Sequence, residues 1–226
     1  MAMLVIVVSV VFFIVVSTVS GALVLRAAGI GIPAIQLGVW GPKVKGRIGE
    51  STVSLSPWLF SGSVTFKDAG NIDNYGNVPG ELFSSLGRLP RAFMMLVGPA
   101  VILFCSVLII GSEAVQAFTA AFYQIPRGAL SPFTYAQKLL ASFWPVVSES
   151  PLEAAALVMG KIAALAFMPI PPFSGGQALM ELSRSKGATH GRSAMVFLQL
   201  GMLIVLLLVV SWIAALGYSL VHSGAI

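Results

Sequence analysis

Few side chains in this sequence could hold a catalytic metal. A catalytic zinc ion needs about three nitrogen, oxygen or sulfur ligands, an open position for water and a base beside it. The sequence has two histidines, His190 and His222, and one cysteine, Cys105, which lies in an apolar run. The topology derived below puts the two histidines on opposite sides of a membrane. We therefore expect no metal site and no cofactor, and we interpret both histidines as solvated loop and tail residues.

Serine nucleophiles are the second kind of chemistry, and Ser17, Ser20 and Ser174 lie in or beside apolar stretches. A serine nucleophile needs an adjacent base, and the candidate at a comparable depth is Lys161. Lys161 precedes Ser174 by 13 residues, or about 20 Å along a helix, which argues against a Ser–Lys pair between them. A pair between Lys161 and a serine of the first helix stays open, although serines in membrane helices more often pack or bond to their own backbone.

Composition predicts that membrane helices position these side chains. The 226 residues are 57% hydrophobic and 9% charged, against about 25% charged in soluble domains. This is too little charge to cover a soluble surface, so we predict an integral membrane protein. No basic tract is interleaved with aromatic residues, so the net charge of +5 bears on membrane topology and we expect no nucleic-acid partner.

Four apolar stretches are long enough to cross a bilayer, for which about 20 apolar residues are needed. They cover about 3–25, 92–112, 152–173 and 194–220. Residues 48–66 show β-branched and aromatic residues in partial alternation, which is typical of short strands or a hairpin. The predicted fold is an all-α polytopic membrane protein with about four transmembrane helices and a small β-hairpin or sheet after the first, in a single domain over 1–226.

The distribution of lysine and arginine predicts the orientation. Ten of these cations fall in 26–91 and 174–193, whereas two fall in 113–151. Because cytoplasmic loops are enriched in lysine and arginine, the first two segments are predicted to be cytoplasmic and both termini to face outward. Seven aromatic residues between 118 and 144 favour an interfacial belt or a re-entrant piece on the outer side. We expect a multi-pass protein of a bacterial-type inner membrane, in contact with the lipid bilayer.

Three segments, taken in order, resemble the core of the site-2 protease family of intramembrane zinc metalloproteases. They read "GPKVKGRIGESTVSLSPWLFSGSVTF", "GRLPRAFMMLVGPAVILF" and "SPLEAAALVMGKIAALAFMPIPPFSGGQALMEL". The resemblance implies a first helix with an HExxH motif, a small membrane-associated sheet at about 40–66, and an Asn-x-x-Pro-x-Pro-x-x-Asp-Gly-Gly motif that ends the third helix. Pro169, Pro171, Gly175 and Gly176 match this last motif at the family's spacing.

The positions that carry chemistry in that family are replaced here. Both histidines and the glutamate of HExxH, which falls on 17–21, are lost, and so is the aspartate of the third motif. The residues now at the first histidine, the glutamate, the second histidine and the aspartate are Ser17, Thr18, Gly21 and Ser174. Residues 1–49 contain no histidine, aspartate or glutamate, so a shifted alignment does not restore the motif. The resemblance therefore implies a retained scaffold and cavity without catalytic zinc, and no catalytic residue is assigned.

We therefore expect a catalytically inactive relative of such enzymes, a pseudoprotease. Its groove can still bind a transmembrane helix of another protein, so we predict an accessory, structural or assembly subunit of a larger membrane complex, with other integral membrane proteins as partners. The alternative is an active intramembrane protease with displaced or non-zinc chemistry. The metal content of the purified protein separates the two.

Partner contact is predicted at the third apolar stretch. A charge within a spanning helix is costly, so Lys161 is expected to face a polar cavity or a partner, with snorkelling toward an interface as the alternative. Small residues such as Ala156 and Gly160 allow close approach of another helix, or they pack against this chain's own second or fourth helix. The candidate partner or cavity residues are Lys161, Ala156, Gly160, Pro169, Pro171, Gly175 and Gly176.

Overall fold

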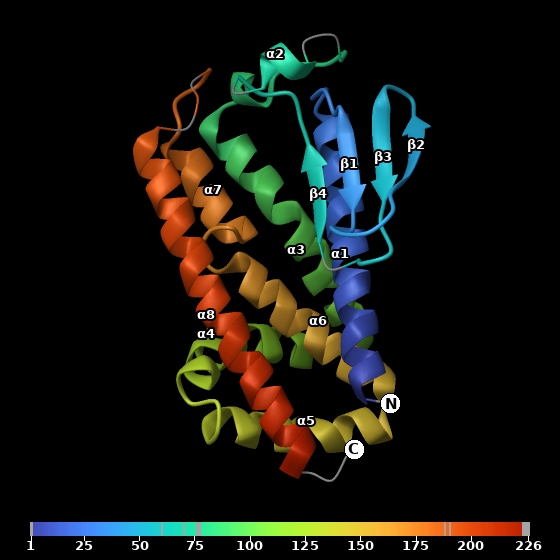
Figure 1. The fold of residues 1–226 in the computed structure, drawn as a ribbon, viewed down its shortest axis with the longest axis vertical. Coiled ribbons are helices and arrows are strands. Elements are labelled where there is room, and N and C mark those ends of the chain that lie inside the picture. Colours follow the sequence, from blue (N-terminus) through green and yellow to red (C-terminus); the bar gives the residue numbers. More distant parts are fainter. Residues whose placement is uncertain are drawn as a thin grey trace.

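Three long apolar helices form the frame of the protein (Figure 1). The computed structural model describes residues 2–59, 61–69, 71–75, 78–187, 189 and 191–222. Within them α1 (Ala2–Ala27), α3 (Arg88–Ile110) and α8 (Arg192–His222) are long and apolar enough to cross a membrane. The predicted stretches at 3–25, 92–112 and 194–220 are therefore confirmed as apolar helices of spanning length.

The fourth predicted stretch, 152–173, is not one helix. α6 (Pro151–Phe167) has 17 residues and ends before a turn at 168–173, and α7 (Ser174–Ser183) begins after it. At 1.5 Å per residue α6 is about 25 Å long, short of the roughly 30 Å of a bilayer's hydrocarbon core. Figure 1 shows α6 and α7 carrying the chain in two pieces from the end that holds the termini toward the opposite end. The expected count of four spanning helices is thus not confirmed.

Proline chemistry explains the break between α6 and α7. The three prolines within 169–172 have no backbone N–H to donate, so they cannot continue the hydrogen-bond ladder of α6. Local bonds close the turn instead, from the Ile170 N–H to the Met168 carbonyl (2.8 Å) and from the Phe173 N–H to the Ile170 carbonyl (3.0 Å). In a bilayer, such non-helical backbone is tolerated only beside protein or a water-filled cavity.

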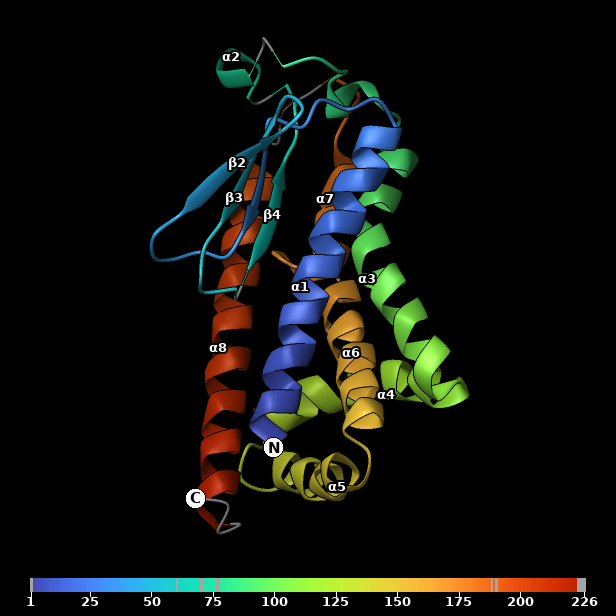
Figure 2. The same cartoon turned by 90° about the vertical axis from the view of Figure 1, so that its right-hand side faces the viewer.

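Two further helices close the end of the molecule that holds both termini. α4 (Ser112–Leu130) and α5 (Tyr135–Glu149) lie across that end in Figures 1 and 2, where the sequence predicted an interfacial belt or re-entrant piece. The Trp212 indole of α8 donates to the Ile125 carbonyl (3.1 Å), and the Gln137 amide of α5 donates to the Ala215 carbonyl (2.9 Å). These bonds fix the C-terminal half of α8 to α4 and α5.

A four-stranded mixed sheet lies beside α1 at the opposite end (Figure 2). Its strands are β1 (Ala34–Leu37), β2 (Val44–Ile48), β3 (Ser51–Leu55) and β4 (Gly62–Thr65), in the order β2-β3-β1-β4. β2 and β3 form an antiparallel hairpin, β3 pairs parallel with β1, and β1 pairs antiparallel with β4. The predicted β segment at 40–66 contains three of these strands, and β1 precedes it. The short helices α2 (Ile72–Tyr75) and η1 (Phe83–Ser85) lead on to α3.

Candidate functional site

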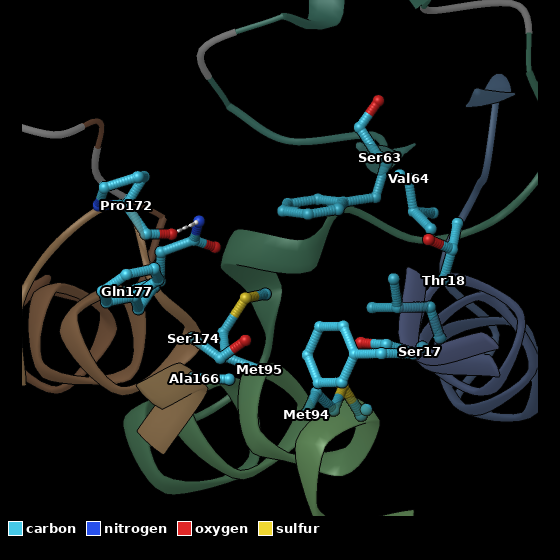
Figure 3. Close-up of a pocket in the computed structure, with 17 residues that line it drawn as sticks. Ser17, Thr18, Ser63, Val64, Met94, Met95, Ala166, Pro172, Ser174 and Gln177 are labelled. Carbon is cyan, nitrogen blue, oxygen red and sulfur yellow. Dashed lines mark hydrogen bonds between the residues drawn. The ribbon is translucent and has the colours of Figure 1, made fainter. Parts of the chain in front are cut away.

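A cavity of about 380 Å³ lies between α1, β4, α3 and the turn that links α6 to α7 (Figure 3). α1 contributes Ser17, Thr18 and Gly21 to its lining, and Ser174 contributes from the start of α7. Residues 17, 18 and 21 share a face of α1 because the helix repeats every 3.6 residues. The four positions that the resemblance aligned with zinc ligands and base therefore line the same cavity, although Ser174 is distant from the others in sequence.

The hydroxyls of Ser17 and Ser174 belong to the lining, and Figure 3 shows them pointing toward each other across the cavity. Thr18 differs, because its hydroxyl donates to the Ile14 carbonyl of its own helix (2.7 Å). The Gln177 amide, also in the lining, donates to the Pro172 carbonyl (2.8 Å). The lining thus combines two facing hydroxyls with the further polar side chains of Thr18, Ser63 and Gln177 and with apolar side chains.

Two glycines bring neighbouring elements close to the substituted positions. A β-carbon at Gly62 of β4 would collide with the Thr18 hydroxyl oxygen, and one at Gly98 of α3 would collide with the Ser17 hydroxyl oxygen. Pro99 has no N–H, so the carbonyl of Met95, a cavity residue, lacks its usual helical donor. β4 and α3 therefore both lie tightly against the face of α1 that carries residues 17 and 18.

The side chains around the cavity do not fit zinc. Among the described residues, its lining offers hydroxyl, amide and thioether groups and no histidine, cysteine, aspartate or glutamate. Across the described part of the chain, no group of three or more such ligands could hold a metal ion. His222 ends α8 about 45 Å along the helix from Arg192, and His190 lies outside the described residues. The cavity can supply shape and hydrogen bonds.

Lys161 is not among the residues that line the cavity. Its ammonium donates to Oε1 of Gln124 on α4 (2.8 Å), so the side chain leaves α6 on the side facing α4. The base considered for a serine nucleophile is therefore bonded elsewhere, and the geometry does not favour a Ser–Lys pair. Sequence reasoning missed Gln124 because it looked for carboxylates within the predicted spanning helices, and Gln124 lies in the segment between two of them.

The small residues of α6 are covered by this chain itself. Ala156 and Gly160 are buried, and the Ser106 hydroxyl of α3 donates to the Ala156 carbonyl (2.7 Å). The Ala114 carbonyl of α4 lies beside Gly160. The sequence suited either a partner helix or packing against the chain's own helices. The structure shows packing against the chain's own helices, and one of them, α3, is the second of the predicted apolar stretches. This face of α6 is therefore closed to a partner helix.

The remaining candidate residues belong to the turn between α6 and α7 and to the start of α7, and they do not line the cavity. Pro169 is exposed, whereas Pro171 is fully buried, and a β-carbon at Gly201 of α8 would collide with the Pro171 carbonyl. Gly175 and Gly176 are buried against the backbone of the turn. These residues hold the start of α7, and with it Ser174, in place.

A buried ion-pair network that joins α3, α7 and the segment after β4 was not predicted from the sequence. Arg91 of α3 pairs with Glu181 of α7 (3.3 Å), and Arg184 pairs with Glu181 (3.0 Å) and with Asp68 (2.5 Å). The Arg91 guanidinium also donates to the Arg184 carbonyl (2.6 Å). Asp68 follows the end of β4 by three residues, so the network ties this strand to α3 and α7.

Asp68 is the member of this network that lies outside the helices. Burial alone would raise its pKa, but the hydrogen bond from the Arg184 guanidinium and the other bonds to the carboxylate outweigh that effect. The pKa of Asp68 is thus held below its ordinary value of 3.8, and the carboxylate stays charged at neutral pH. The Ser84 N–H also donates to it (3.0 Å), which fixes η1 to the same point.

No model of a known protein family matches this chain, and no curated protein matches it. The resemblance to site-2 proteases therefore rests on the three quoted segments and on the positions that they define. In the fold, the four residues at those positions line one cavity.

Proposed function

We propose that the protein is a catalytically inactive, site-2-protease-like membrane protein that binds a transmembrane segment of another subunit. One observation carries this proposal. Ser17, Thr18, Gly21 and Ser174, which stand at the family's ligand and base positions, surround the same cavity but supply none of the side chains that bind zinc in that family. Such a scaffold retains shape and hydrogen-bonding groups, which suits an accessory, structural or assembly subunit of a larger membrane complex.

The cavity suits a segment whose own helix is interrupted. Phe13, Met94 and Phe173 give it apolar walls, and the hydroxyls of Ser17 and Ser174 face one another across it. Backbone groups released from a helix inside a bilayer need partners, since hydrocarbon offers none. A hydroxyl can both donate and accept, so it can bond an N–H or a carbonyl without introducing charge. The proposed ligand is therefore an apolar transmembrane segment with a local break or a small polar residue.

Photo-crosslinking in the native membrane tests this function. Phe173 lines the cavity, so benzoyl-phenylalanine in its place is expected to give a discrete covalent adduct with another membrane protein, which mass spectrometry identifies. The matched control is the same probe at Phe104 of α3, which is 61% exposed and is expected to react with lipid. Lipid adducts alone from Phe173, or the same protein adduct from both positions, would contradict the proposal.

The rival function is an active intramembrane protease with displaced or non-zinc chemistry. It needs a base beside Ser17 or Ser174, and no described residue of that kind lines the cavity, while Lys161 is bonded to Gln124. Zinc content and cleavage of a transmembrane peptide by the purified protein separate the two functions. Near one equivalent of zinc, or cleavage abolished by Ser17→Ala or Ser174→Ala, would favour the rival.

We further propose a bacterial-type inner membrane in which 26–91 and 174–193 are cytoplasmic and both termini face outward. The sheet and α2 lie away from the end that holds the termini (Figure 1), and the distribution of lysine and arginine is the reason for assigning the sheet's end to the cytoplasm. In a Cys105→Ala background, a membrane-impermeant maleimide added to spheroplasts is expected to label a cysteine at Ser131 and not one at Asn74. Labelling of both from the same side would refute this topology.

A further inference from the structure

The sheet has an apolar face that extends beyond the helices. Side chains alternate along each strand, so the registers define which positions share a face. Ile35 and Val64 lie opposite each other and pack against the core beside α1, and Val53 continues their row on β3. On the same face of β2, Val44 and Ile48 are 73% and 64% exposed, because β2 lies farthest from α1 (Figure 2).

The other face of β2 is cationic. Lys45 and Arg47 alternate with the apolar positions and pair with hydroxyl-bearing residues of β3. Lys43 precedes the strand, and the Arg26 guanidinium at the end of α1 lies beside the β2–β3 turn. All four side chains are exposed, and Glu50 is the acidic residue of the hairpin. We refer to residues 43–50 as the cationic hairpin.

The attachment of the sheet to α1 sets its depth. Gly62 packs against Thr18, which lies nine residues before the end of α1 at Ala27, or about 14 Å along the helix. With α1 across the bilayer, this depth falls within one leaflet, whose hydrocarbon half is about 15 Å thick. The strand registers place Val44 in the same cross-strand row as Gly62, and so at the same depth. From Val44, β2 runs toward the end of α1 at Ala27. Its cations therefore approach the level of the lipid headgroups.

We propose that the cationic hairpin binds the phosphate groups of anionic phospholipids in the leaflet that surrounds this end of α1. Val44 and Ile48 contact acyl chains, and Lys45, Arg47 and Arg26 reach the headgroups, as long cationic side chains do near an interface. β2 is an edge strand of the described sheet, and toward its Ile48 end headgroups with their water satisfy backbone groups that hydrocarbon would leave without partners. The inference does not depend on partner binding in the cavity.

Binding of a short-chain phosphatidylglycerol to the purified full-length chain, followed by native mass spectrometry, tests this inference. Phosphatidylcholine with the same acyl chains is the reference ligand. The double variant Lys45→Gln/Arg47→Gln is expected to weaken phosphatidylglycerol binding about 25-fold, at about fivefold per cation, and to leave phosphatidylcholine binding unchanged.

The matched control is Arg127→Gln/Lys138→Gln, which removes the same charge from exposed residues of α4 and α5 at the opposite end of the molecule from the sheet. This variant is expected to bind phosphatidylglycerol as tightly as the wild type does. Equal weakening in both double variants would reveal a general charge effect and overturn the inference. Equal affinity of the wild type for the two lipids would overturn it as well.

Discussion

Replacing Glu181 by glutamine is expected to lower the free energy of unfolding by about 3–5 kcal/mol. Glu181 is the shared partner of Arg91 and Arg184, and the three side chains are 7%, 0% and 3% exposed. A neutral amide leaves two buried guanidinium groups without this counter-charge. In the described residues, the ion pair of Asp68 is with Arg184 and not with Arg91. Unfolding in mixed detergent–SDS micelles measures the loss.

Two variants separate the effect of charge from other causes. Glu113→Gln removes an exposed carboxylate from the first turn of α4 and is expected to change stability by less than about 1 kcal/mol. Arg91→Met/Glu181→Met removes both partners, and it is expected to recover most of the stability that Glu181→Gln loses, because apolar replacement of a buried ion pair is often neutral. A loss below about 1 kcal/mol in Glu181→Gln would show that these charges are not coupled in the folded state.

The long helices were predictable because composition determines them. α1, α3 and α8 are apolar enough to lie in lipid, so an apolar run of about 20 residues locates each one without knowledge of its neighbours. The same reasoning failed at 152–173 because the turn after Phe167 is also apolar. Hydropathy does not distinguish a helix from a turn that protein surrounds, although the prolines marked where the break falls.

The sheet and the ion-pair network depend on contacts that no local pattern encodes. β1 is only four residues long, so it shows little alternation of apolar and polar residues. It pairs parallel with β3, with Ala34 opposite Thr52. Arg91 reads in the sequence as one more cytoplasmic cation beside an apolar run. Its burial against Glu181 follows from the packing of α3 on α7, which only the fold reveals.

The candidate site was predictable in part. The resemblance to site-2 proteases singled out Ser17, Thr18, Gly21 and Ser174, and the structure places all four around the cavity. The small residues of α6 and Lys161 were harder to interpret, because the same pattern suits a partner helix or the chain's own helices. The contacts of α6 with α3 and α4 decided between these interpretations. The sequence does not indicate that either helix is a neighbour of α6.

Two glycine-to-alanine substitutions are expected to change stability in opposite directions. Gly176 lies in α7 against the preceding turn, where a β-carbon would collide with the Pro171 nitrogen and the carbonyl carbon of Ile170. Backbone atoms cannot rotate away as a side chain can, so Gly176→Ala is expected to cost about 3 kcal/mol. Gly21 of α1 has open space at the same place, so Gly21→Ala is expected to add about 0.5–1 kcal/mol, as alanine does within a helix.

The same pair of variants tests how Ser174 is positioned. Gly176 follows Ser174 by two residues and packs on the turn, whereas Gly21 lines the cavity from α1. If the packed turn holds the start of α7, Gly176→Ala should speed alkylation of a cysteine placed at Ser174 in a Cys105→Ala background, because a displaced α7 opens the cavity. Gly21→Ala should leave that rate unchanged or slow it, since its methyl group narrows the cavity. Equal destabilisation by the two substitutions, or a Gly176→Ala protein as stable as the wild type, would contradict the tight packing of this turn.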